Sequence, residues 1–308
     1  ITFIGSALAS GSISIFNFAN DLQYIPIGIV ALSFVTAVFP SLSESYSKND
    51  MREFLDKFYS AVNQILFLVI PISVFLILER AQIVRIFLGA GEFSWNDTKL
   101  TAAALGIFAL SVFAQSLIPL FSRAFFAMEN SRTPVLINVS SLLLNVGLSF
   151  YFVHLLKVGG AFHDFLAGAL KVGDVYDISV LGLPLAFSVS GIINILWLYF
   201  ALSHKIESYR SDKILHSVSR INLSVLLMGI AVYPTLYFTA DLVDMHTFFG
   251  VFIQGAAAFL VGSAVYFGCA YFLKIPEFFA FWEAFTLPIK RMFLSKTYAS
   301  QVNGSEKL

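Results

Sequence analysis

Long apolar runs, separated by short charged segments, dominate the chain. The longest extends from Gly11 to Ser43 and contains one charged side chain, Asp21. A run of about eighteen or more apolar residues predicts a membrane-spanning helix. As a helix this run would be about 50 Å long, whereas the hydrocarbon core of a bilayer is about 30 Å thick. The helix must therefore tilt, bend or protrude, and Pro26, which lacks a backbone donor, predicts a bend.

Seven runs of this kind predict seven full transmembrane helices. They cover residues 11–43, 58–78, 100–122, 133–156, 178–203, 221–240 and 247–273. The apolar residues 1–9 predict the end of an eighth helix. Pro71 and Pro119 predict kinks in the second and third spans, because proline removes a backbone hydrogen bond. The expected fold class is an all-α polytopic membrane protein.

Three segments are expected at the membrane surfaces. In residues 50–59 the large apolar side chains fall on one helical face and Asp50 can cap the N-terminus, which predicts an amphipathic start of the second span. Residues 161–170 predict a short helix at the opposite surface, and the aromatic and basic residues 274–296 predict a segment along the cytoplasmic surface.

The basic residues of the connecting loops predict the orientation. If the loop after Ser43 is cytoplasmic, fourteen of the nineteen Lys and Arg residues lie on the cytoplasmic side. The five on the outer side are Arg80, Arg85, Lys99, Lys157 and Lys171. Cytoplasmic loops carry an excess of Lys and Arg, so we expect this orientation.

Composition supports a membrane protein and offers little for catalysis. The chain is 58% hydrophobic and 12% charged, whereas soluble domains carry about 25% charged residues. The net charge is zero, so no basic face suggests a nucleic-acid partner. The histidines lie near span ends or in loops without metal-ligand spacing; they are His154, His163, His204, His216 and His246. We therefore expect neither an enzyme nor a metal site, and no cofactor.

Polar residues inside the first span form the main candidate site. On a helix, Ser14, Asn17, Asp21 and Tyr24 share one face, and Asn20 lies beside it. A carboxylate within a span is costly and by default suggests function, here substrate binding or ion coupling. The other spans carry one or two amides each, which we expect to form hydrogen bonds between helices. These amides are Asn63, Gln64, Gln115, Asn138, Asn145, Asn194 and Gln254.

Small residues are regularly spaced in the last span. Gly255, Ala258 and Gly262 lie within one apolar run, and spacing of this kind allows close contact between helices. Two interpretations stay open at this point: ordinary helix packing, and a smooth groove for a lipid chain.

Three segments together resemble one transporter family. They are ASGSISIFNFANDLQYIPIGIVALSFVTAVFPSLS at Ala9–Ser43, GAGEFSWNDT at Gly89–Thr98 and SRAFFAMENSRTPV at Ser122–Val135. Their order and spacing are similar to those of the MurJ (MviN-type) lipid II flippases. The family's Arg-Ala-Phe-Tyr-Ala…Thr-Pro-Val signature corresponds to Arg123, Phe125, Phe126, Thr133 and Pro134.

The resemblance implies a transporter of the MOP superfamily with fourteen helices, built from two six-helix lobes and two further helices. Residues 1–204 would supply the C-terminal lobe, from the end of helix seven to helix twelve. Residues 205–308 would supply the two further helices, which form a groove for the lipid tail, and an interfacial C-terminal stretch. We expect an N-terminal lobe of the same protein as a partner.

The resemblance also implies a function in peptidoglycan biosynthesis. Such a protein moves the undecaprenyl-diphosphate-linked precursor, lipid II, from the cytoplasmic to the periplasmic leaflet of the bacterial inner membrane by alternating access. Its partners would be this precursor and membrane lipid. A coupling ion, a proton or sodium, is left open.

One departure from the family keeps rival functions open. Where the family usually has an arginine suited to the diphosphate, this chain has Asn20 and Asp21. The closest rival is another MOP-type transporter, either a multidrug/cation antiporter or a polysaccharide-lipid flippase, and the acidic residue favours the antiporter. A non-transporting membrane scaffold is the alternative from another class of protein.

Overall fold

The computed structural model describes residues 11–88, 95–206, 212–245, 247–284 and 286. The predicted helix end at residues 1–9 lies outside these residues, as do the basic residues 290–296 of the C-terminal stretch. Within the described residues, six helices are long and apolar enough to cross a membrane, and the number is seven if one bent pair of helices is counted as a single span. The predicted all-α polytopic fold is confirmed, with six or seven candidate spans.

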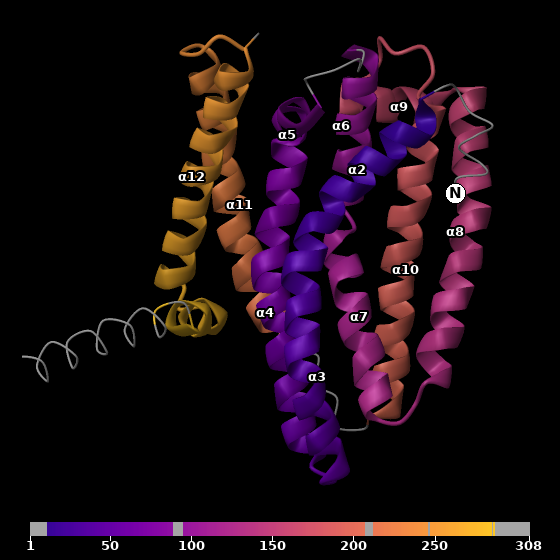
Figure 1. Cartoon of the computed structure of the whole chain (residues 1–308), viewed down its shortest axis with the longest axis vertical. Helices are drawn as coiled ribbons and strands as arrows, with labels where there is room; N and C mark the ends of the chain where they lie inside the picture. Colours follow the sequence, from indigo (N-terminus) through magenta and orange to yellow (C-terminus); the bar gives the residue numbers. More distant parts are fainter. Residues whose placement is uncertain (1–10, 89–94, 207–211, 246, 285, 287–308) are drawn as a thin grey trace, which may run out of the picture.

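The first span is a bent helix of 36 residues, Ser12–Ser47. It consists of α2 (Ser12–Pro26), one π-helical turn (Ile27–Ala31) and α3 (Leu32–Ser47). In Figure 1, α2 runs obliquely across the bundle and α3 stands upright. The change of direction follows Pro26, as predicted. Proline cannot donate a backbone hydrogen bond to the preceding turn, and the π turn comes directly after it.

The second span is a single helix, α4 (Met51–Leu78), followed by the short α5 (Arg80–Leu88). Its predicted amphipathic start is part of the same helix. The Asp50 carboxylate accepts a hydrogen bond from the Glu53 backbone N–H at 2.9 Å, which confirms the predicted cap. Phe54 and Phe58, on the apolar face of this amphipathic start, are fully buried.

The third span breaks at a different place from the one predicted. α6 (Trp95–Ala109) and α7 (Val112–Ala127) meet at 46°, and α7 continues through Pro119 without a break. At the break, the Ser188 hydroxyl donates to the Ile107 carbonyl at 3.0 Å and the Ser111 hydroxyl donates to the Phe108 carbonyl at 3.0 Å. These hydroxyls stabilise the bend because they satisfy carbonyls at the end of α6.

The remaining helices complete the bundle and its side arm. They are α8 (Arg132–Val158), α9 (Ala161–Leu170), a 3₁₀ turn (Ser179–Leu181), α10 (Gly182–Lys205), α11 (Asp212–Ala240) and α12 (Phe248–Phe272). The short helix predicted at 161–170 is α9. Residues 276–284 are also helical and lie across the lower end of α12 (Figure 1).

α11 and α12 stand to one side of the bundle (Figure 1). They pack on each other, and α11 contacts α4 while α12 contacts α5. Their apolar residues form a hydrophobic cluster of their own with Phe67 and Phe75 of α4. The Tyr266 hydroxyl donates a hydrogen bond to the Phe67 carbonyl, which attaches α12 to the same helix.

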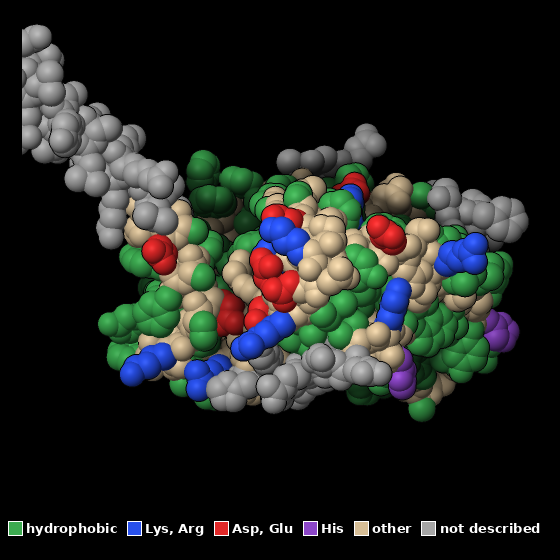
Figure 2. Space-filling view, turned by 90° about the horizontal axis from the view of Figure 1, so that it is seen from below, with side chains coloured by type: hydrophobic (Ala, Val, Ile, Leu, Met, Phe, Trp, Pro, Cys, Tyr) green, Lys and Arg blue, Asp and Glu red, His purple; other side chains and the backbone are tan. Residues whose placement is uncertain are grey.

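The loops alternate between the two ends of the bundle. The α3–α4 and α7–α8 turns lie at the lower end in Figure 1, and α5 and α9 lie at the upper end. The lower end is the one expected to be cytoplasmic. Figure 2, which shows this end, has side chains of both charges spread over the face among apolar ones.

Candidate functional site

The buried face of α2 fixes the direction of its polar face. Ile15, Phe16, Ala19 and Leu22 are buried against the bundle, mainly against α6. The Phe16 ring meets the Phe108 ring edge to face, with 5.4 Å between the centroids. Because one side of α2 packs against the bundle, its opposite side faces away from the core of the bundle.

Four of the predicted site residues lie on that opposite side. Ser14, Asn17, Asp21 and Tyr24 are all exposed, and 53% of the Tyr24 surface is accessible. Asp21 forms no ion pair with any residue that the structure describes. The structure therefore brings these four polar side chains onto one open face, which we call the polar face of α2.

Asn20 lies at the edge of this face and joins it to the core. It is half-buried, and its side-chain oxygen accepts a hydrogen bond from Gln23 Nε2 at 3.0 Å. Gln23 is fully buried, and its Oε1 has no hydrogen-bond partner among the described residues. Asn20 thus shares a hydrogen bond with a buried amide of the same helix.

Ser33 and Thr36, which were not predicted as site residues, extend the polar face along α3. Both are exposed, and each hydroxyl donates to a carbonyl of its own helix at 2.6 Å. The π turn inserts one extra residue, so the exposed position one turn after Tyr24 is Ile29, five residues later. The exposed side then continues through Ser33 and Thr36. Their spacing of three residues on an apolar helix was the available signal.

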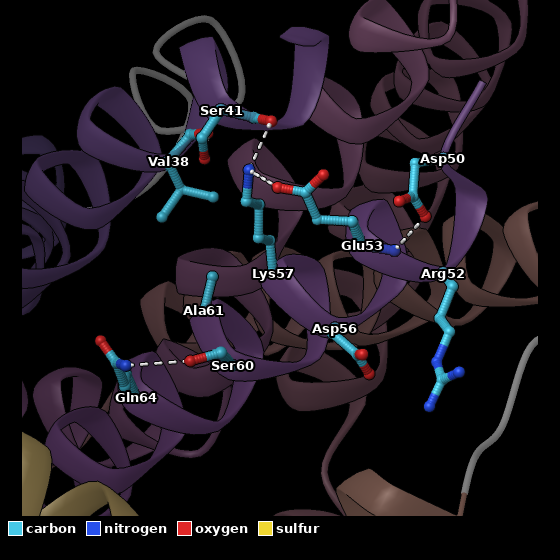
Figure 3. A pocket seen from close by; sticks show the side chains of 10 residues that line it. All are labelled: Val38, Ser41, Asp50, Arg52, Glu53, Asp56, Lys57, Ser60, Ala61 and Gln64. Carbon is cyan, nitrogen blue, oxygen red and sulfur yellow. Dashed lines mark hydrogen bonds and ion pairs between the residues drawn. The ribbon is translucent and has the colours of Figure 1, made fainter. Parts of the chain in front are cut away.

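A charged pocket lies between α3 and α4 at the end expected to be cytoplasmic. It has a volume of about 480 Å³. Lys57 bridges its walls: Nζ lies 2.6 Å from Glu53 Oε1, 3.0 Å from Ser45 Oγ and 3.4 Å from the Ser41 carbonyl. Figure 3 shows Lys57 between Glu53 and Ser41, with Asp50, Arg52 and Asp56 around the same opening. This end of the helix pair therefore carries a mixed charge.

The signature residues build the α7–α8 turn at the same end. Phe125 is fully buried, Pro134 is buried and Phe126 is 39% exposed. Asn130 exchanges two hydrogen bonds with Thr133, one with its hydroxyl at 2.9 Å and one with its backbone N–H at 3.2 Å. These contacts cap α8 and give the turn one shape.

Arg123 connects this turn to the first span. Its side chain is exposed, and its guanidinium lies over the Phe39 ring of α3 at 4.9 Å from the centroid. A cation over an aromatic face attracts the ring quadrupole. Arg123 thereby contributes to holding α7 beside α3.

Polar residues also meet between α7, α8 and α10. Asn194 Nδ2 donates to Asn138 Oδ1 at 3.0 Å, and Asn145 Nδ2 donates to Ser190 Oγ at 3.0 Å. They line a pocket of about 220 Å³ together with Gln115. For Asn138, Asn145 and Asn194 the predicted hydrogen bonds between helices are confirmed.

The small residues of α12 lie in helix contacts and do not line an open groove. Gly255, Ala258 and Gly262 are all buried. A Cβ at Gly262 would come within 2.5 Å of Val232 Cγ2 and 2.6 Å of Phe75 Cζ. The structure therefore uses this glycine for close packing, because α12 approaches α11 and α4 too closely for a larger side chain.

An open apolar groove occurs instead between α4 and α11. It has a volume of about 800 Å³. Its lining is almost entirely apolar and comprises Val74, Leu78, Asn222, Val225, Leu226, Gly229, Ile230, Tyr233 and Pro234. Its size and lining suit a hydrocarbon chain.

A sequence profile described as lipid II flippase MurJ matches residues 1–253. A probable lipid II flippase MurJ of Buchnera aphidicola subsp. Schizaphis graminum is 28% identical over 279 residues, which are 89% of this chain and 49% of that protein. The lipid II flippase MurJ of Thermosipho africanus is 27% identical over 251 residues, which are 81% of this chain and 44% of that protein.

A solved structure has a similar fold. It is a lipid II flippase MurJ in an inward closed conformation, 27% identical, with a TM-score of 0.66. The match covers 88% of this chain and 49% of that one. The chain thus spans about half the length of the curated relatives it matches.

Proposed function

Because the chain belongs to the MurJ family of lipid II flippases, we propose that it forms one lobe of a transporter for a lipid-linked peptidoglycan precursor. The precursor would move from the cytoplasmic to the periplasmic leaflet by alternating access. In such transporters one lobe rocks against another around a site near the middle of the membrane. The second lobe would cover the polar face of α2.

The polar face of α2 is the observation that carries this proposal. It places Ser14, Asn17, Asp21 and Tyr24 on the open side of a span, where lipid would be a costly neighbour for a carboxylate. An aqueous cavity shared with a second lobe removes that cost. The hydroxyl and amide groups could then bind the polar head of a substrate.

Asp21 sets a condition on the substrate. A bare carboxylate repels a diphosphate at short range, so the charge of Asp21 must be neutralised when such a head group is bound. A proton, a bound cation or an arginine of the second lobe would each do this. We propose that Asp21 is a coupling or counter-charge residue, and that Asn20 supplies a hydrogen-bonding group beside it.

The groove between α4 and α11 is our candidate for the lipid tail. Polyprenyl chains are apolar and flexible, and the groove offers an apolar surface of about 800 Å³ with Gly229 in its lining. In this proposal the lipid tail lies between α4 and α11. The small residues of α12 have a different role, which is to pack α12 closely against these two helices.

A cation-coupled antiporter is the second candidate function. The observation that favours it is Asp21 itself, since an exposed carboxylate inside a span is a common cation or proton site. In that case the polar face would bind a cationic solute and the groove would be filled by ordinary lipid.

The test is reconstitution of the complete flippase in vesicles that contain fluorescent lipid II. We expect lipid II to become accessible on the opposite leaflet faster than in protein-free vesicles. The outcome that would overturn the proposal is movement of an organic cation in exchange for protons or sodium while lipid II stays in its leaflet.

The 308-residue chain alone serves as an informative control. With one lobe, nothing rocks against the polar face of α2, so we expect no translocation above the level of empty vesicles. Lipid II transport by this chain alone would contradict the role proposed for a second lobe.

A further inference from the structure

A basic pocket opens at the outer end of the bundle, away from the polar face of α2. It lies between α5, α6 and the end of α9, which share the upper end in Figure 1. Its volume is about 180 Å³. Its charged lining residues are Arg80, Arg85, Lys99 and Lys171, and the remaining lining residues are Ala81, Trp95, Thr98, Ala102 and Leu170. None of the described lining residues is acidic.

These four cations lie close together although basic residues are few on this side of the protein. Outer loops are poor in basic residues, and the topology assigns only five to this side. Four of those five line this one pocket, and Lys157 is the fifth. Three separate segments of the chain contribute them, so their proximity is a product of the tertiary structure.

The pocket is only partly neutralised. Lys99 donates a hydrogen bond to the Asp174 carboxylate, which holds the pKa of that carboxyl below its usual range. Arg80, Arg85 and Lys171 form no ion pair with any described residue. Three cations in one small concavity repel each other unless an anion lies among them.

Three of the cations are held by contacts with neighbouring residues. The Arg85 guanidinium lies 5.8 Å and Lys99 Nζ 5.6 Å from the centroid of the Trp95 ring. Arg85 also donates to the Met245 carbonyl, and the Arg80 stem packs against α6, where a Cβ at Gly106 would lie 3.1 Å from Arg80 Cδ. The donors of the pocket are therefore pre-organised for a ligand.

The surroundings place the pocket at the level of lipid head groups. Phe87 of α5 is 64% exposed, and Phe165 of α9 is 70% exposed. Trp95 itself is 60% exposed at the start of α6. Exposed aromatic side chains of this kind gather where the hydrocarbon core meets the head groups.

We propose that this pocket binds a phosphate group at the outer surface of the membrane. Arginine and lysine are the side chains that bind phosphate oxygens, and basic pockets between transmembrane helices hold anionic lipid head groups. The phosphate could belong to a phospholipid of the outer leaflet or be free in solution. This inference does not depend on the proposed transport function.

The experiment measures the binding of phosphatidylglycerol to the purified flippase by native mass spectrometry, with phosphatidylcholine as the neutral reference. Arg80→Gln and Lys171→Gln each remove one pocket charge. Lys157→Gln is the matched control, because Lys157 lies on the same side at the end of α8 and outside the pocket. A parallel titration with inorganic phosphate measures displacement of the lipid.

We expect each pocket variant to weaken phosphatidylglycerol binding about five-fold, and the double variant about twenty-fold, with phosphatidylcholine unaffected. Displacement by inorganic phosphate at equal concentration would assign the site to free phosphate, and resistance to displacement would assign it to the lipid. Both results support a phosphate site.

Equal weakening by Lys157→Gln would overturn the proposal, because it would show a diffuse charge effect. Equal binding of the two lipids by the unaltered protein would also overturn it. Arg80 packs against α6, so its substitution could impair folding. Lys171 is exposed, and Lys171→Gln alone then decides the outcome.

Discussion

Asp21 is the side chain on which the proposed transport role depends most. It is the only charge between Gly11 and Ser43, and it lies on the polar face of α2 with Asn17 and Tyr24 beside it. A carboxylate in this position costs about 2.5–3.5 kcal/mol on insertion scales. A neutral amide of the same shape would cost less than a carboxylate, so the charge itself requires an explanation.

We predict that Asp21→Asn in the complete protein lowers transport at least about ten-fold, which corresponds to about 1.4 kcal/mol, and alters its dependence on pH or sodium. The change keeps the shape of the side chain and removes its charge. Transport in vesicles at several pH values, with and without sodium, checks this. Glu129→Gln, at an exposed position in the α7–α8 turn, is the matched control.

Two results would contradict the coupling role of Asp21. If activity and its dependence on pH and sodium all stay unchanged, the carboxylate has no part in transport. If Asp21→Asn prevents accumulation in the membrane, the carboxylate serves an ion pair that holds the protein together. Asp21→Arg adds a further comparison, because higher activity would mark this as the family's phosphate position.

At the scale of the element, two contacts decide how the helices pass one another. α6 and α7 bend where the hydroxyls of Ser111 and Ser188 satisfy backbone carbonyls. α12 approaches α11 and α4 at Gly262, where another side chain would not fit. In both cases a small side chain determines the geometry of a long helix.

Gly262→Ala should destabilise the protein by about 1–3 kcal/mol, because the added methyl overlaps Val232 and Phe75. Gly268→Ala in the same helix is its control, since a Cβ there meets nothing within 4 Å. Thermal unfolding in detergent compares the two. Equal midpoints would show that α12 is not in close contact with α11.

Ser188→Ala should lower stability by about 1 kcal/mol, because the Ile107 carbonyl at the bend loses one of its two hydrogen bonds and keeps the one from the Leu110 N–H. Ser203→Ala, in the same helix, removes an exposed hydroxyl that bonds only to its own backbone, at the Phe200 carbonyl. Chemical unfolding of both variants measures the difference. If Ser203→Ala proves the more damaging change, the bend does not depend on Ser188.

At the scale of the whole molecule, the chain is a bundle with a two-helix arm. The arm is joined to the bundle through α4 and α5 and has its own hydrophobic cluster. The two ends of the bundle differ in chemistry. The lower end carries the charged pocket around Lys57, and the upper end carries the basic pocket around Arg80.

The orientation of the bundle gives a direct prediction. A cysteine at Asn49 should lie in the cytoplasm and one at Asp174 outside, because the basic residues favour that arrangement. An impermeant thiol reagent applied to intact cells should label position 174 alone, with Cys269 replaced by alanine in both variants. Labelling of position 49 but not of position 174 would reverse the topology.

The sequence by itself determined the spans, the shared face of Ser14, Asn17, Asp21 and Tyr24, and the family. These follow from hydrophobic runs, helical periodicity and local motifs, which depend on residues close together in the chain. The cap at Asp50 and the bend after Pro26 were predictable for the same reason.

Only the tertiary structure decided the features that depend on distant segments. The third span bends at Ser111 because Ser188, from another helix, reaches it. Gly262 lies in a packed contact because α11 and α4 stand opposite it, and the open groove is therefore elsewhere. Likewise Arg80 and Lys171 are far apart in sequence, and packing of α5, α6 and α9 brings them into one pocket.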